Sequence, residues 1–171
     1  MPVNSVANAE KLIKNKTWQV IDAATIEGSG ESFFEDEKAK SDSAIAPAEE
    51  KLKWFSTIKG IDTATDFIGS FYKENFIKFK KISISLNNDS IATTKGMDAE
   101  KQVFSINNSV EEKKPIGIKL TLAGYNTAFA SMGVSNAVTT YYILGADDKK
   151  LYLLSPYKLN DLKVVFLLET K

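Results

Sequence analysis

The side chains that most often carry acid–base, nucleophilic and metal chemistry in proteins are missing from this chain of 171 residues. It has no histidine, cysteine or arginine, and all 22 of its basic side chains are lysine, against 22 acidic ones. This removes the usual general base near neutral pH, the thiolate nucleophile and the guanidinium group that binds phosphates in two places. Chemistry would have to run on lysine, carboxylate or tyrosine, so we predict that the protein is not an enzyme and uses no cofactor.

Two pairs of carboxylates and one acidic cluster have the residue types that hydrolysis or cation binding would need. Asp62 with Asp66, and Glu111 with Glu112, could act as acid and base if a cleft held them together. Both pairs fall at expected helix starts or turns, where acids cap helices or stay solvated. Glu35-Asp36-Glu37 offers oxygen ligands but lacks the alternating spacing and the glycine of a calcium loop. We interpret all three as solvated and predict no catalytic and no metal-binding residue.

The charge and hydropathy pattern argues against nucleic-acid binding and against a transmembrane segment. The formal net charge is zero, and Lys80-Lys81 and Lys113-Lys114 are too short to form a basic tract for a phosphate backbone. No apolar run approaches the ~18 residues that cross a bilayer. Residues 1–5 lack the basic and apolar regions of a signal peptide, so export would require a leader or a lipid-bearing cysteine upstream. The lack of cysteine fits both an exported and a cytoplasmic protein.

Aromatic residues are the stronger functional signal. The chain has ten Phe, six Tyr and two Trp, and most of these must fill the core. Tyr142 and Tyr152 fall on adjacent strands of one predicted hairpin, and Phe67 and Phe71 fall on a predicted helix. We name these four as ligand-lining candidates, with core packing as the alternative for each.

The first half of the chain predicts one strand among helices and loops. A short helix is expected before residue 14, because apolar side chains recur there at helical spacing: Val6, Ala9, Leu12 and Ile13. The first strand is predicted over 17–23, followed by a turn at Gly28-Ser29-Gly30 and a polar loop over 31–46. Two helices are then predicted within 47–74. The first has Leu52, Phe55 and Ile58 on one face and ends at Gly60, and Asp62 caps the second.

The second half predicts strands throughout. They are expected over 76–86, 90–95, 102–107, 116–122, 138–144, 151–155 and 164–170. Within 76–86 the alternation of apolar residues changes phase at Lys80-Lys81, which predicts a bulge or sharp bend. Residues 125–132 fit either a helical turn or a loop.

About eight strands with hairpin connections favour an antiparallel barrel over a sandwich. We predict a single domain over 1–171, mainly β. It would be an eight-stranded up-and-down barrel with a short N-terminal helix and a loop and helical insertion over 28–75, between the first two strands.

With a strand that opens on Lys16-Thr17-Trp18 and three apolar strands near the C-terminus, the chain resembles the lipocalin-like (calycin-type) β-barrel proteins of Bacteroidetes. Many of these are exported or lipid-anchored. Trp18 matches the tryptophan of the lipocalin Gly-x-Trp motif, and Lys16 stands in place of the glycine. Lipocalins pack an arginine from the last strand across that tryptophan. The resemblance therefore implies either that Lys163 or Lys171 takes this place or that the barrel is closed differently. It also implies that the protein is exported to the periplasm or the cell surface.

Residues 47–74 also resemble the helix-turn-helix that fatty-acid-binding proteins insert between their first two strands as a lid. Because those proteins hold the ligand carboxylate with arginine and tyrosine, the absence of arginine leaves the ligand undefined.

The predicted barrel is compatible with two functions. The first is non-enzymatic binding of a small apolar or amphipathic ligand in the barrel, because an eight-stranded barrel can hold one small ligand. The alternative is a structural or interaction module at the bacterial cell surface, with no ligand cavity and an exposed apolar patch or strand edge for a partner.

Overall fold

The computed structural model describes residues 3, 5–26, 52–57, 67–96, 101–107, 116–122, 138–159 and 162–171, except for the side chains of 67–72, 121–122 and 156–159. The predicted strands over 17–23, 90–95, 102–107, 116–122, 138–144, 151–155 and 164–170 are confirmed. The polar loop over 31–46 and the segment 125–132 lie outside the described residues.

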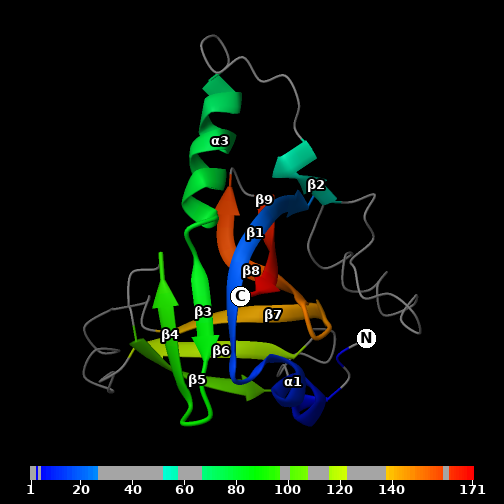
Figure 1. The fold of residues 1–171 in the computed structure, drawn as a ribbon. Coiled ribbons are helices and arrows are strands. Elements are labelled where there is room, and N and C mark those ends of the chain that lie inside the picture. Colours follow the sequence, from blue (N-terminus) through cyan, green and yellow to red (C-terminus); the bar gives the residue numbers. More distant parts are fainter. Residues whose placement is uncertain are drawn as a thin grey trace.

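The fold is mainly β, as predicted, and eight antiparallel strands close into a barrel (Figure 1). The barrel strands are β1 Lys16–Ile26, β3 Ser83–Leu86, β4 Ile91–Lys95, β5 Lys101–Asn107, β6 Gly117–Leu122, β7 Val138–Ala146, β8 Lys150–Leu159 and β9 Leu162–Thr170. From β3 onward each strand pairs with the next, β1 pairs with β3, and β9 pairs back with β1. In Figure 1, β5, β6 and β7 run across the direction of β1 and β3, so the barrel is strongly coiled.

The first strand, β1, organises the barrel because both of its edges are paired. One edge pairs with β9 over most of its length, from Trp18 opposite Thr170 to Ile26 opposite Lys163. The other edge pairs first with β3 and then with a short additional strand, β2 Leu52–Trp54. The register of β1 against β9 shifts between Val20 and Asp22, and such a bulge bends a strand and increases its twist.

The predicted strand over 76–86 is wrong in its first part. Helix α3 Phe67–Phe79 extends into it, and the strand starts only at Ser83. The backbone N–H of Ile82 donates to the carbonyl of Phe79 at 2.9 Å, which ends the helix in a turn. The change of phase at Lys80-Lys81 therefore marks a boundary between helix and strand, and the predicted bulge there is also wrong.

The first predicted helix within 47–74 is wrong where the structure describes it. Residues 52–57 form β2 and a short 3-10 helix, η2 Phe55–Thr57. Two interactions favour this conformation over a helix. Leu52, Lys53 and Trp54 pair with β1, and the Asp22 carboxylate accepts hydrogen bonds from the backbone N–H of Ser56, at 3.2 Å, and from its hydroxyl.

Replacing Asp22 with alanine is expected to destabilise the protein by about 1–3 kcal/mol, because the N–H groups of Ala23 and Ser56 and the Ser56 hydroxyl would lose their acceptor. Urea unfolding of the D22A variant measures this loss. In a double-mutant cycle with S56A, a coupling energy near zero would contradict the importance of this contact.

One continuous cluster of buried apolar side chains forms the core of the barrel. At one end, helix α1 Val6–Ile13 places Ala9, Leu12 and Ile13 in this core, and the Ser5 side chain caps the helix by accepting from the N–H of Asn8 at 3.2 Å. This is the predicted N-terminal helix, and we call this end the α1 end.

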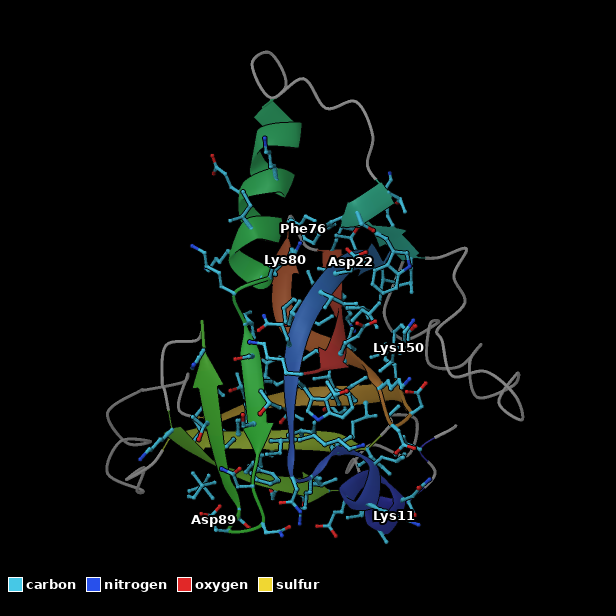
Figure 2. All side chains as sticks on the ribbon, in the orientation of Figure 1. Lys11, Asp22, Phe76, Lys80, Asp89 and Lys150 are labelled. Atoms are coloured by element: carbon cyan, nitrogen blue, oxygen red, sulfur yellow. The ribbon has the colours of Figure 1, made fainter. Side chains whose placement is uncertain are left out.

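The opposite end, which we call the α3 end, is closed on one side by aromatic rings. Phe79 packs on Phe166, with ring centres 5.0 Å apart, and Phe55 packs on both Phe76 and Phe79. Figure 2 shows Phe76, Lys80 and Asp22 together at this end, with Asp89 and Lys11 at the other. Helix α3 meets the barrel through its last turns and rises away from it (Figure 1).

Trp18 is fully buried at the α1 end and is fixed there by two contacts. Its indole N–H donates to the carbonyl of Ile13 at 3.0 Å, and the ammonium group of Lys16 lies 5.6 Å from the centre of the ring. The resemblance to lipocalins implied a cation from Lys163 or Lys171. The cation comes instead from Lys16 on the same strand, which also contacts Asp148 at 3.4 Å.

The turn between β7 and β8 is stabilised by Asp147. Its carboxylate accepts hydrogen bonds from the backbone N–H groups of Lys149 and Lys150, each at 2.7 Å. The hydrogen bond from Lys149 is the main cause that lowers the pKa of Asp147 below its ordinary value of 3.8.

Because the pKa of Asp147 is lower in the folded state, its ionised form stabilises the fold. This stabilisation is fully present above the unfolded value of 3.8 and is lost as pH falls through the folded pKa. We expect an Asp147→Asn variant to be less stable than the parent near neutral pH, and the difference to shrink in acid. Unfolding free energies measured from pH ~6 to pH ~2 test this. A difference that does not change with pH would contradict it.

Candidate functional site

The inner surface of the barrel changes character at the α3 end. Because side chains alternate across a strand, residues in phase with the core point inward. Among the described side chains, the inward-facing residue nearest the α3 end carries a hydroxyl or an amide on five strands. We call this set the polar ring: Thr25 on β1, Thr94 on β4, Gln102 on β5, Thr139 on β7 and Ser155 on β8.

The strand registers support this placement. Thr25 and Ser155 both lie opposite Val164, which belongs to the barrel core. Thr139 lies opposite Leu120, also a core residue. Gln102 shares its face of β5 with Phe104 and Ile106, and Thr94 shares its face of β4 with Ala92; these three neighbours all belong to the core.

Four of the five ring residues are buried, with exposed fractions of 1% for Thr25 and Thr94, 6% for Gln102 and 5% for Ser155. The Gln102 amide donates to the Thr94 hydroxyl over 3.5 Å, a long contact. No described buried polar side-chain atom lacks a partner. The ring is therefore satisfied as it stands, and its hydroxyls, each with one donor and two lone pairs, can form further hydrogen bonds.

The opposite end of the barrel has no comparable polar set among the described side chains. The buried residues there are apolar, and they include Trp18, Leu86, Ile106, Leu151 and Leu168. The interior thus has an apolar α1 end and a polar α3 end.

Of the four ligand-lining candidates, the structure describes the side chains of Tyr142 and Tyr152, and both lie on the outer face of the barrel. Tyr142 packs against a second, outer cluster, while its neighbours Tyr141 and Ile143 belong to the interior. Tyr152 packs edge-on against Trp54, with ring centres 6.3 Å apart. Neither side chain faces the interior of the barrel, so any ligand contact they make is on its outer surface.

That outer cluster covers the outer faces of β1, β7, β8 and β9 beside β2. Its buried members are Ala24, Ile26, Leu52, Leu154 and Val165, and its partly buried members are Trp54, Tyr142 and Leu144. The short strand β2 therefore has a structural role, because it covers apolar side chains on the outside of β1.

Phe67 and Phe71 lie on helix α3 as predicted, but their side chains are outside the described residues. The three acidic sets also lie outside the described residues: Asp62 with Asp66, Glu111 with Glu112, and Glu35-Asp36-Glu37.

In the ranges that the structure describes, no three acidic residues converge to hold a metal ion, and no helix has the length and hydropathy to cross a membrane.

The sequence contains a signal for the polar ring: a polar residue stands in phase with the apolar residues at the end of a strand. Gln102 precedes Phe104 and Ile106 in the same phase, and Ser155 follows Leu151 and Leu153 in the same phase. A polar residue thus ends an apolar face on each strand. Only the strand order shows that these ends meet at one end of the barrel.

The fold and this site define a class: a closed eight-stranded antiparallel barrel whose interior is polar at one end. No family model and no curated protein matches the chain. Among solved structures, it is similar to the crystal structure of a DUF4847 family protein from Bacteroides vulgatus, with 12% sequence identity and a TM-score of 0.45. The similarity covers 94% of this chain and 96% of that chain. At this TM-score the likeness carries no argument about function, and the resemblance to lipocalins stays a prediction.

Proposed function

We propose that this protein is a non-enzymatic carrier or receptor that binds a small amphipathic molecule at the α3 end of its barrel. The observation that carries this proposal is the polar ring. Buried hydroxyl and amide groups need hydrogen-bond partners, which the buried members of the ring have, whereas an apolar α3 end would complete the core without needing any. Ligand sites in barrels also lie at the mouth, where a few polar groups meet an apolar surface.

The apolar part of the ligand would contact the aromatic rings beside the polar ring. Phe166 is 1% exposed and packs against Phe79 on α3. The Phe79 ring in turn contacts Phe55 on η2. Because α3 and η2 contribute these rings from outside the barrel, a shift of α3 or η2 would expose Phe166 to a ligand. Helix α3 therefore has the position expected of a lid.

Titration calorimetry with short-chain monoacylglycerols and fatty acids tests the proposal. Tryptophan fluorescence is a poor readout, because Trp18 lies at the α1 end and Trp54 lies on the outer face. The ring variants Thr94→Val and Gln102→Leu are expected to weaken binding by about tenfold or more, which corresponds to the loss of one hydrogen bond. Thr93→Val, on the outer face of β4, is the matched control and should bind like the parent. If no ligand in the set binds the parent, or if the control weakens binding equally, the proposal fails.

A second function, an interaction module, is favoured by the outer face of β4–β7. Val103 and Val138 are exposed at 44% and 36%. Each lies opposite Thr121 on the strand between them, and Ile91 lies opposite Val103, so the register aligns β-branched residues in one row across four strands. Exposed apolar side chains in such a row are the kind of feature that a partner covers.

The second function predicts association through this row rather than ligand binding inside. Val103→Lys should abolish any concentration-dependent association in sedimentation velocity, while Ser105→Lys on the same face provides a control for charge. Unchanged monomeric behaviour of the parent over a wide concentration range would argue against self-association.

Export to the periplasm or cell surface, with a lipid anchor upstream, is part of our proposal for either function. It is supported by the resemblance to the lipocalin-like proteins of Bacteroidetes. Fractionation of cells that express the native gene tests it directly.

A further inference from the structure

We infer that the group of the ligand that enters the polar ring is uncharged and bears hydroxyl or amide groups, so that the site selects neutral amphiphiles over fatty acids. This inference rests on the proposed function. It follows from the chemistry of the ring, which combines threonine and serine hydroxyls with one carboxamide and includes no ionisable side chain.

The lysines of the neighbouring barrel strands whose side chains the structure describes do not add a positive charge to the ring, because they face outward. Lys95 is two residues beyond Thr93 on the outer face of β4, and Lys101 lies opposite Thr93 on the same face. Both side chains are exposed. On β9, Lys163 lies opposite Ile26, which belongs to the outer cluster.

One lysine lies closer to the ring. Lys53 on β2 is opposite Thr25 and therefore on the same face of the sheet. It is exposed and belongs to a strand outside the closed barrel. Its ammonium group could meet an anionic ligand at the rim, but a carboxylate held there would remain outside the polar ring.

Among the side chains that the structure describes, a carboxylate inside the ring would be separated from water without a cationic partner. The penalty for burying an unpaired charge is much larger than the penalty for a hydroxyl that keeps its hydrogen bonds. Threonine, serine and glutamine can instead donate to and accept from a hydroxyl or amide group of the ligand. The ring therefore matches the glycerol end of a monoacylglycerol or the amide end of a fatty amide.

The test compares ligands with the same chain and different head groups on the full-length protein. Monodecanoin, decanamide and decanoic acid are titrated calorimetrically near neutral pH, below their aggregation concentrations. We expect the two neutral ligands to bind at least about tenfold more tightly than decanoate. Thr94→Val and Gln102→Leu should remove this preference, and Thr93→Val should keep it.

Three other results would contradict the inference or the proposed function. If decanoate binds at least as tightly as the neutral ligands, the inference is wrong while the proposed function stands. Weaker binding of decanoate alone by Lys53→Gln would then show that the site recognises an anion at the rim. If the neutral ligands bind more tightly but the ring variants leave that preference unchanged, the ring does not recognise the head group and the inference is again wrong. If none of the three binds, the proposed function itself fails for this class of ligand. Circular dichroism of each variant confirms that it is folded.

Discussion

Replacing Trp18 with alanine is expected to destabilise the protein by about 3–5 kcal/mol, at the upper end of what one truncated core side chain costs. Trp18 is fully buried, and its removal would leave a cavity between α1 and the start of β1. The carbonyl of Ile13 would lose the indole N–H that it accepts from, and Lys16 would lose the ring beside its ammonium group. Unfolding in urea, followed by circular dichroism, measures the loss.

Two further variants separate the contributions to this effect. Trp18→Phe keeps most of the apolar contact and removes the indole N–H, so it should cost less than Trp18→Ala. Trp54→Ala, which removes a partly buried tryptophan from the outer face, should also cost less. Equal losses for Trp18→Ala and Trp54→Ala would contradict the central place of Trp18 in the core.

Replacing Phe79 with alanine is the second large effect, at about 3–4 kcal/mol. Phe79 is 4% exposed and joins α3 to the barrel through its contacts with Phe166 and Phe55. Loss of the ring should both destabilise the fold and release the last turn of α3 from the barrel. Hydrogen exchange of the α3 amides, measured together with urea unfolding, distinguishes a local release from a global loss of stability.

The matched control is Ile77→Ala on the same helix. Ile77 is 51% exposed, so its replacement should change stability by less than about 0.5–1 kcal/mol. If Ile77→Ala and Phe79→Ala have the same effect, α3 is not anchored through the aromatic rings.

The sequence predicts the barrel well where each strand has one buried face. In 116–122 the buried residues Ile116, Ile118 and Leu120 recur at every second position, and β6 follows this pattern. Hairpins are also predictable, because the β7–β8 turn contains Asp147, whose carboxylate binds the next backbone N–H groups. These features depend on residues that are close together in the chain.

Features that depend on distant residues could not be predicted. The apolar alternation after residue 76 predicts a strand, but Phe76 and Phe79 lie at helical spacing, and their contacts with Phe55 and Phe166 stabilise the end of helix α3. Residues 52–57 have helical spacing, but pairing with β1 and the Asp22–Ser56 contact determine their structure. The polar ring could not be predicted for the same reason, because it forms only when five strand ends meet.

Closure of the barrel by β1 and β9 has a consequence for the way this chain folds during synthesis. One edge of β1 pairs with β9, the last strand of the barrel, so the ribosome must release nearly the whole barrel sequence before this pairing can form. Contacts between residues far apart in a chain raise its contact order and slow its folding. Until β9 arrives, β1 and β8 present unpaired edges that can associate with other chains. The chain is therefore prone to aggregate during synthesis. This stage ends when the final strand of the barrel, Leu162–Thr170, pairs with β1 and β8.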